Sequence, residues 1–133
     1  MATPNPPFKR YCKALTLQDD PTLMAKYAQV HRPDAVWPEI TQGMKDVGIL
    51  DMEIYRFGNI LFMIMDTVVD FEHDTAMQRL ATQPRQSEWE AYVSQFQQTD
   101  AQATADEKWQ LLERVYEMDQ QQDRAPEAGQ IKA

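Results

Sequence analysis

The sequence predicts an α+β domain of the ferredoxin-like kind, in which an antiparallel sheet carries helices on one face. Its residue pattern favours the order strand, helix, strand, strand, helix and a less distinct last strand, which is the split β-α-β arrangement. Gly58-Asn59, between the second and third strands, is typical of a hairpin turn. The third strand is apolar on both faces, so we expect both faces to be covered.

The first strand and the first helix are predicted on either side of an acidic turn. Side chains alternate along residues 8–17, which indicates a strand with mixed faces. Asp20 is suited to cap a helix and Pro21 to occupy its first position. We expect this helix to end at His31, because Pro33 lacks an amide hydrogen and disfavours helical backbone just before it.

The middle of the chain is predicted to form one more helix and the hairpin. Pro38 suits a first helical turn and Gly48 suits a helix end, which places a helix between them. Residues 49–57 and 60–69 have the composition of the second and third strands. Since helices lie on only one face of such a sheet, we expect a second copy of the chain to cover the other face in a two-fold symmetric homodimer.

The last third of the domain is expected to be mainly helical. Asp70 is a good N-cap for a helix to about Leu80, and Pro84 breaks that helix. A further helix over residues 87–97 has its aromatic residues on one face. Residues 108–118 fit both a helical and a strand spacing, and the choice between the two stays open.

The domain itself is expected to span residues 8–118. Residues 1–7 contain three prolines and no periodicity, which predicts a disordered leader. Residues 119–133 are rich in Gln, Asp, Glu and Ala, and we expect a disordered polar tail there because such residues bury too little apolar surface to fold.

Composition excludes several classes of partner. Thirteen Lys and Arg against 21 Asp and Glu give a net charge of −8, which argues against nucleic acid or an anionic membrane surface. No apolar run approaches the roughly 20 residues of a membrane span. Cys12 is the single cysteine, so no disulfide can form within the chain, which suits a cytoplasmic location.

Tyr27 and His31 are the first candidates for chemistry. They are four residues apart on the predicted helix, so their side chains lie over the same patch. A histidine with an ordinary pKa near ~6.5 can both give and take a proton at neutral pH, and a neighbouring phenol can orient a hydroxyl. The alternative is a helix corner whose histidine and tyrosine only pack.

Other candidates lie on the late helix and on the second strand. Trp89 and Glu90 supply the aromatic face and the polar group that a sugar pocket needs. The more ordinary role of Trp89 is in the core, and that of Glu90 is a solvated helix position. On the second strand Met52 alternates with Glu53 and Tyr55, so one face is apolar and the other polar.

The sequence contains no recognised motif for binding a cofactor. There is no Gly-rich phosphate loop, no HExxH site and no Gly-x-Ser-x-Gly elbow. The two histidines are 42 positions apart, which does not favour a metal centre. We therefore expect no cofactor and no metal.

An ordered set of features resembles the L-rhamnose mutarotase family, which also contains L-fucose mutarotases. The features are Tyr27-x-x-x-His31, Trp37-Pro38-Glu39, Glu53-Ile54-Tyr55, the strand that follows Asn59, and Trp89. The resemblance covers approximately residues 8–118, which would form a single mutarotase-like domain. It implies a dimeric α+β barrel of ferredoxin-like subunits.

The resemblance also implies roles for individual residues. The implied site residues are catalytic His31, as proton donor, and substrate-binding Tyr27, Met52, Tyr55, Trp89 and Glu90. The chain departs from the family at three places. Glu90 replaces the second of two adjacent aromatic residues, Met52 replaces a strand tyrosine unless Tyr55 takes its place, and two extra residues follow His31 before the Trp-Pro-Glu.

The expected function is therefore that of an aldose mutarotase. It would interconvert the α and β anomers of a 6-deoxyhexose, L-fucose or L-rhamnose, by acid/base-assisted ring opening. One alternative on the same architecture is a cofactor-free oxygenase or haem-handling protein, with His31 as base or iron ligand. Another is a non-catalytic sugar-binding module. The expected partners are a monosaccharide and a second copy of the chain.

Overall fold

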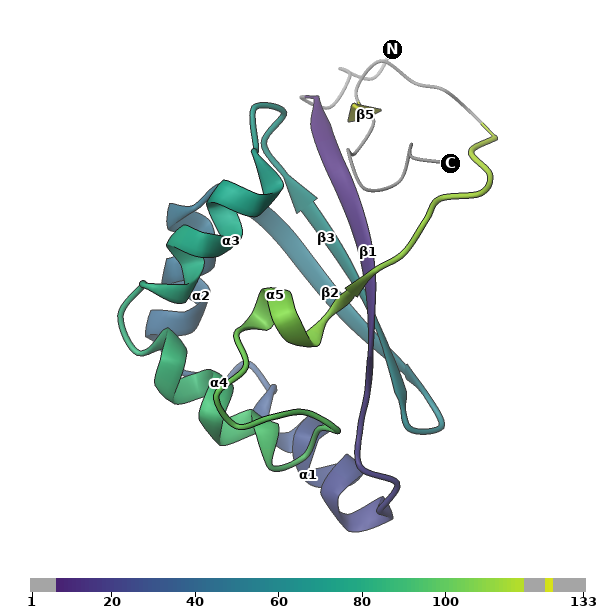
Figure 1. Ribbon diagram of the computed structural model, residues 1–133, viewed down its shortest axis with the longest axis vertical. Helices are drawn as coiled ribbons and strands as arrows, with labels where there is room; N and C mark the ends of the chain where they lie inside the picture. The colour runs from purple at the N-terminus through teal and green to yellow at the C-terminus, as the bar shows by residue number, and fades with distance from the viewer. Residues whose placement is uncertain (1–6, 119–123, 126–133) are drawn as a thin grey trace.

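The computed structural model describes residues 7–118 and 124–125, and Figure 1 shows the arrangement of its elements. The strands are β1 Phe8–Thr16, β2 Ile49–Phe57, β3 Ile60–Thr67, β4 Gln110–Leu111 and β5 Arg124–Ala125. The helices are α1 Pro21–Val30, α2 Pro38–Asp46, α3 His73–Ala81, α4 Gln86–Ser94 and α5 Ala105–Lys108. The predicted leader 1–7 and tail 119–133 lie outside the described residues, except for Pro7 and the two residues of β5.

The sheet confirms the α+β prediction. Its strands lie in the order β2-β3-β1-β4, and each neighbouring pair is antiparallel. β5 pairs in parallel with the start of β1. The predicted hairpin turn lies between β2 and β3, and Gly58 there has a φ of 59°, which glycine adopts without steric cost. β1 and β3 are therefore the central strands.

Several element boundaries differ from the prediction; α4, for example, ends at Ser94 rather than at Gln97, and β3 ends at Thr67 rather than at Val69. α3 begins at His73 rather than after Asp70, because Asp70 lies in a turn in which the Phe71 amide donates to the carbonyl of Val68. Residues 108–118, whose spacing fits both a helix and a strand, contain the end of one and the whole of the other: α5 ends at Lys108, and the two-residue strand β4 follows. A Thr104–Glu107 capping box starts α5.

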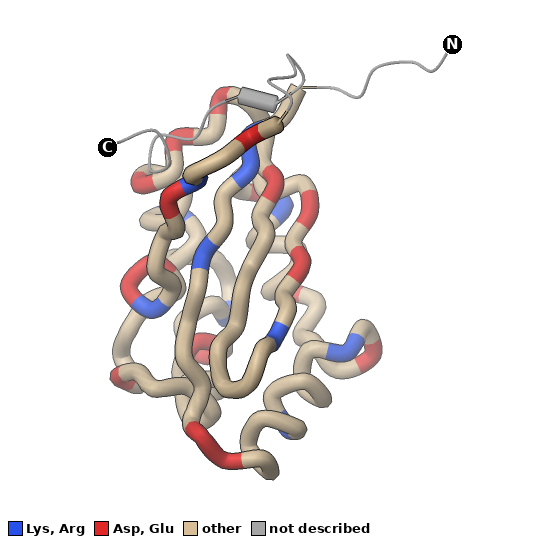
Figure 2. Tube along the Cα trace, turned by 90° about the vertical axis from the view of Figure 1, so that its right-hand side faces the viewer, with Lys and Arg blue, Asp and Glu red and all other residues tan. Residues whose placement is uncertain are grey.

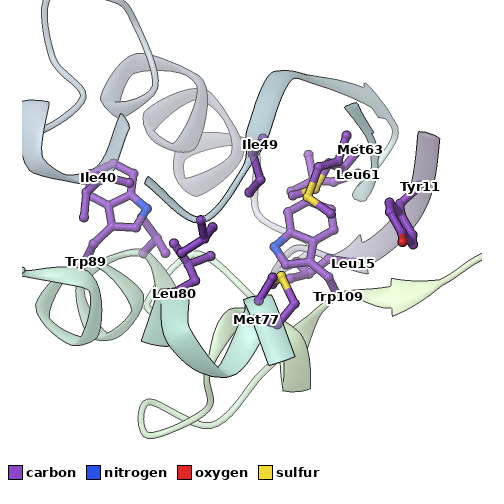
Figure 3. Close-up of a cluster of buried hydrophobic side chains, with 14 of the residues drawn as sticks. Tyr11, Leu15, Ile40, Ile49, Leu61, Met63, Met77, Leu80, Trp89 and Trp109 are labelled. Carbon is purple, nitrogen blue, oxygen red and sulfur yellow. The ribbon is translucent and has the colours of Figure 1, made fainter. Parts of the chain in front are cut away.

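All the larger helices cover one face of the sheet, as predicted (Figure 1). The core lies between these two layers, and it includes Leu15 and Leu61 of the sheet, Ile40, Leu80 and Trp89 of the helices, and Trp109 (Figure 3). The longest described helix, α1, has 10 residues, and no described helix is long and apolar enough to cross a membrane.

None of the described helices lies on the opposite face of the sheet. Alternation and register place Cys12, Ala14, Tyr55, Phe57, Ile60, Phe62 and Ile64 on it. Phe57 is 80% exposed, Tyr55 55% and Phe62 39%. Figure 2 views the molecule from this outer side, and β3 runs there almost without charged residues. We call these seven side chains the outer face; they form an apolar patch that the described residues of one chain leave uncovered.

Candidate active site

A pocket between the sheet and the helices brings most of the predicted site residues together. Tyr27, His31, Met52, Trp89 and Glu90 all line it. They come from α1, the residue after α1, β2 and α4, so the pocket exists only in the folded domain. The remainder of the wall is mostly apolar, as is usual for small-molecule sites.

Tyr55 does not belong to this group within one chain. It is on β2 at an odd step from Met52, so its side chain leaves the opposite face of the sheet. Its hydroxyl donates to Glu53 at 3.0 Å, and more than half of the residue is exposed. Of Met52 and Tyr55, only Met52 lines this pocket.

Helix capping positions the Tyr27–His31 pair. The Asp20 carboxylate accepts hydrogen bonds from the amides of Thr22 and Leu23, which starts α1 in the predicted register. Tyr27 and His31 are then one turn apart, and their ring centroids lie 4.2 Å from each other. The helix ends at His31, as Pro33 predicts, so the imidazole sits at a fixed helix end.

His31 is held in one protonation pattern. Its Nδ1 lies 2.7 Å from the carbonyl oxygen of Tyr27, and since a carbonyl can only accept, Nδ1 must carry the hydrogen. Burial lowers the pKa of His31 below its ordinary value, and the Tyr27 hydrogen bond offsets only part of this effect. At neutral pH the ring is therefore uncharged, and its Nε2 is a proton acceptor.

The pKa of Tyr27 is shifted upward, opposite in direction to that of His31. The residue is 5% exposed, and burial raises the pKa of its phenol well above the usual range, although a side-chain hydrogen bond with Gln97 acts against the shift. The phenol therefore stays protonated. A protonated phenol can orient a substrate hydroxyl, and Tyr27 is suited to this role rather than to exchanging a proton.

Trp89 links the histidine to the other aromatic residues. Its ring meets that of His31 edge-on at 5.3 Å and that of Trp37 edge-on at 5.1 Å. Trp37 stacks on Tyr92 at 5.6 Å, and the Arg85 guanidinium lies 4.1 Å from the Trp37 ring. These contacts pack Trp37, in the segment after His31, against α4, which carries Trp89.

Glu90 is buried and paired, not solvated. One carboxylate oxygen lies 2.9 Å from the Lys108 ammonium, and the other accepts from the Gln86 amide at 2.6 Å. Lys108 has no side-chain exposure and also donates to the Glu90 backbone carbonyl at 2.7 Å. A carboxylate in such surroundings is stabilised by its partners, and removing either partner leaves a buried charge.

Two glutamine oxygens in the same pocket have no hydrogen-bond partner among the described residues. They are Oε1 of Gln86 and Oε1 of Gln97, both fully buried atoms. Both residues line the pocket, and they are 4% and 2% exposed. Buried polar atoms are nearly always paired, so two unpaired acceptors in one pocket indicate a place for donors from a ligand.

The pocket opens beside His31. His31 and Met52 line both the buried pocket and an open groove between α2 and β2, together with Met44, Ile49 and Ile54. The histidine is half-buried, whereas Tyr27 and Trp89 are deeper. A ligand that enters by this groove would meet His31 first.

Sequence patterns did not point to three of the polar groups that line the pocket. Gln86 lies on α4 one turn before Trp89, and Gln97, which follows the end of α4, continues the same helical spacing in the sequence, so this spacing was an available signal. Lys13 alternates with Tyr11 and Leu15 on β1 and faces the core, which is rare for a lysine. Among the described residues no group of three His, Cys, Asp or Glu side chains is placed to hold a metal ion.

Comparison with known proteins bears on this site. The sequence profile of L-rhamnose mutarotase matches residues 10–118. The chain is 36% identical over 108 residues to an L-fucose mutarotase of Xanthomonas campestris pv. campestris, an alignment that covers 81% of this chain and 86% of that protein. It is 30% identical over 116 residues to a UPF0734 protein of Dictyostelium discoideum, covering 84% and 91%.

A solved structure is similar in fold. The crystal structure of an L-rhamnose mutarotase from Formosa agariphila superimposes with a TM-score of 0.64 at 22% sequence identity. The match covers 84% of this chain and 99% of that one.

Proposed function

The chain belongs to the L-rhamnose mutarotase family, and from this premise we propose that it interconverts the α and β anomers of a 6-deoxyhexose, L-fucose or L-rhamnose. The relative with 36% identity is an L-fucose mutarotase, whereas the matching profile is named for L-rhamnose. Both sugars lack the 6-hydroxyl, and 6-deoxyhexose is the substrate class that the two names share.

The observation that carries the proposal is the content of one pocket. It combines a neutral histidine with a free lone pair at Nε2, a buried tryptophan and two unpaired amide oxygens. A pyranose offers matching groups: hydroxyl donors for the amide oxygens and an apolar C–H face for the indole. The anomeric hydroxyl is the group whose proton must move, and His31 is the acceptor at the mouth of the pocket.

The mechanism follows from what ring opening needs. His31 Nε2 takes the proton of the anomeric hydroxyl while the bond between C1 and the ring oxygen breaks, and the ring oxygen gains a proton. The open aldehyde turns about the C1–C2 bond and closes on its other face, and the imidazolium returns its proton to the new anomeric oxygen. Such a positioned acid or base typically contributes ~10²–10⁴-fold to the rate.

Tyr27, Trp89, Glu90 and Met52 would bind the sugar. The Tyr27 phenol orients a hydroxyl, and Trp89 lies against the ring face. Met52 meets the 6-methyl group, an apolar contact that a 6-hydroxyl would lose. Glu90, whose two oxygens hold Lys108 and Gln86, shapes the far wall, and it keeps a carboxylate within reach of a sugar hydroxyl.

We further propose that two chains associate through the outer face, as a dimeric α+β barrel. The exposed aromatic side chains of this face support the proposal, because a contiguous apolar patch on one side of a sheet needs a cover. A cytoplasmic location agrees with the single cysteine of the chain.

The proposed function is tested by NMR anomer exchange. The wild-type protein is added to equilibrated L-fucose, L-rhamnose, D-galactose and D-glucose, and saturation transfer between the anomeric protons is measured. We expect faster exchange for one or both 6-deoxy sugars and little for D-glucose. Saturable binding of a 6-deoxy sugar without faster exchange would show a binding module instead, and no effect on any sugar would reject the proposal.

A further inference from the structure

Ring opening needs an acid for the ring oxygen as well as a base for the anomeric hydroxyl. A neutral His31 supplies the base. We propose that Lys13 is the general acid, and that its ammonium group donates a proton to the ring oxygen of the bound sugar. This assignment rests on the function proposed above and adds a second catalytic residue to it.

The place of Lys13 in the fold supports this role. It lies on β1, where its backbone pairs with Met63 of β3 and Leu111 of β4, so it is inside the sheet and not at a free edge. Its side chain points to the helix-covered face and is part of the pocket wall that includes His31. The residue is 1% exposed, among the most buried in the described part of the chain.

Lys13 differs from the other buried lysine in its lack of partners. Lys108 is paired with Glu90, whereas the ammonium of Lys13 has no hydrogen bond or ion pair with any residue that the structure describes. A buried cation without a partner is costly, and a core position is normally apolar. The group is therefore available to a ligand in the pocket.

The surroundings also suit proton donation. Burial lowers the pKa of Lys13 from 10.5 to about 8, although Asp106 of α5 and Asp74 of α3 oppose the shift. The other charged residue that the structure describes in the pocket wall is Glu90, which is paired with Lys108, while His31 is neutral. At pH 7 Lys13 is thus still protonated, but it releases its proton far more easily than an exposed lysine does.

The other titratable groups of the pocket are less suitable as the acid. Tyr27 has a raised pKa and holds its proton firmly. Glu90 is a carboxylate whose oxygens are engaged by Gln86 and Lys108. Lys108 is in turn fixed to Glu90 by two contacts. Lys13 is the titratable group that remains.

The proton transfers balance without a further reactant. The anomeric O–H bond breaks and its proton goes to His31 Nε2, while the electron pair of the C1–ring oxygen bond stays on that oxygen. The same oxygen takes a proton from Lys13, which leaves a neutral amine and an open aldehyde. On closure the hydroxyl returns its proton to the amine and attacks C1, and His31 protonates the new anomeric oxygen.

The test compares Lys13→Met and Lys13→Arg with wild type, for the sugar that wild type turns over. Lys9→Met is the matched control, because Lys9 is on the same face of β1 but outside the pocket wall. For each variant the exchange rate is measured from pH 6 to 10, after subtraction of the spontaneous rate, and sugar affinity is measured by chemical-shift titration.

We expect both Lys13 variants to lose about 10²-fold or more in rate while affinity changes only a few-fold. Wild type and Lys9→Met should lose rate as pH rises through about 8, where Lys13 gives up its proton, and the Lys13 variants should lack this alkaline fall. Arginine keeps the charge but is too weak an acid, so its failure would separate proton donation from simple electrostatics.

Other outcomes overturn the assignment. Full activity of Lys13→Met, or of Lys13→Arg if the methionine variant does not fold, would remove Lys13 from the mechanism and leave the mutarotase function intact. An exchange rate that still falls above about pH 8 in either Lys13 variant, as it does in wild type, would also remove Lys13 from the mechanism. If wild type accelerates exchange of none of the sugars, the proposed function fails, and the role of Lys13 fails with it.

Discussion

The protonation state of His31 depends on two contacts that a mutation or a pH change can test. The Tyr27 carbonyl fixes the hydrogen on Nδ1, and burial keeps the ring neutral. The exchange rate should therefore fall as pH drops through a pKa that lies below the ordinary ~6.5 of histidine, because protonated Nε2 cannot act as a base.

This prediction is measured as the pH profile of the exchange rate between pH 4 and 7. The variant His73→Gln is the control, since His73 is the other histidine and does not line the pocket. It should show the same acid fall as wild type. A midpoint well above 6.5, or a profile without an acid fall, would contradict a buried neutral His31.

Lys13 should also leave a signature in stability. Its pKa is lowered to about 8 in the folded protein but returns to 10.5 on unfolding, so between these values the unfolded chain binds more protons. The free energy of unfolding should therefore rise with pH through this window, by about 2 kcal/mol from pH 8 to 10. Above pH 10 the raised pKa of Tyr27 has the opposite effect, and it lowers the free energy of unfolding as pH rises.

Urea unfolding at several pH values checks this prediction. In Lys13→Met the rise should be absent, and at pH 7 the variant should be at least as stable as wild type, because it removes a buried unpaired charge. A stability that falls from pH 8 to 10 in wild type would contradict the assigned environment of Lys13.

Individual site residues could be predicted from the sequence only where they form a local pattern. Tyr27 and His31 share a helical face, and α1 places both in the pocket as that spacing requires. Glu90 has no such signal, because its burial depends on Lys108, which is 18 positions away. Lys13 reads as one residue of an alternating strand, and its isolation in the pocket is a property of the tertiary structure alone.

At the scale of elements, one ion pair connects the segments behind the pocket. Glu90 of α4 and Lys108 of α5 are both buried, and Lys108 also holds the α4 backbone. The variant Glu90→Leu should lose about 3–5 kcal/mol of unfolding free energy, because it leaves the Lys108 ammonium buried without a counter-charge.

A double-mutant cycle by urea denaturation measures this coupling. Adding Lys108→Met to Glu90→Leu should restore most of the lost stability, since an apolar pair of similar size is often no worse than a buried ion pair. If the two single losses simply add in the double variant, the pair is not coupled and the packing of α5 on α4 has another cause.

Elements with a strong local signal were the predictable ones. The hairpin follows from Gly58-Asn59 and the alternation around it, and the start of α1 follows from Asp20 and Pro21. α5 and β4 are too short for a periodicity to appear over their few residues. Their positions depend on the pairing with β1 and on the burial of Trp109.

At the scale of the molecule, the outer face raises the question of assembly. The sequence predicts that β3 is covered on both faces. The described residues cover only one of them, because Ile60 and Phe62 on the other face remain partly exposed. We expect sedimentation equilibrium to show a dimer. The variant Phe62→Glu should give a monomer, because it buries a carboxylate in an apolar interface.

Ala91→Glu is a suitable control for this experiment. Ala91 is exposed on α4, in the helix layer opposite the outer face, so the same charge there should leave the dimer unchanged. A wild-type protein that is monomeric at micromolar concentration, or a Phe62→Glu variant that remains dimeric, would contradict association through this face.

Proton transfer by His31 in a sugar pocket is tested most directly by anomer exchange in wild type and in His31→Gln. Exchange of L-fucose and L-rhamnose is followed by NMR at pH 7, and the melting temperature of each protein is recorded. We expect wild type to accelerate at least one exchange and His31→Gln to lose about 10²-fold or more of that rate with little change in melting temperature. A folded His31→Gln protein that retains the wild-type rate would contradict the account.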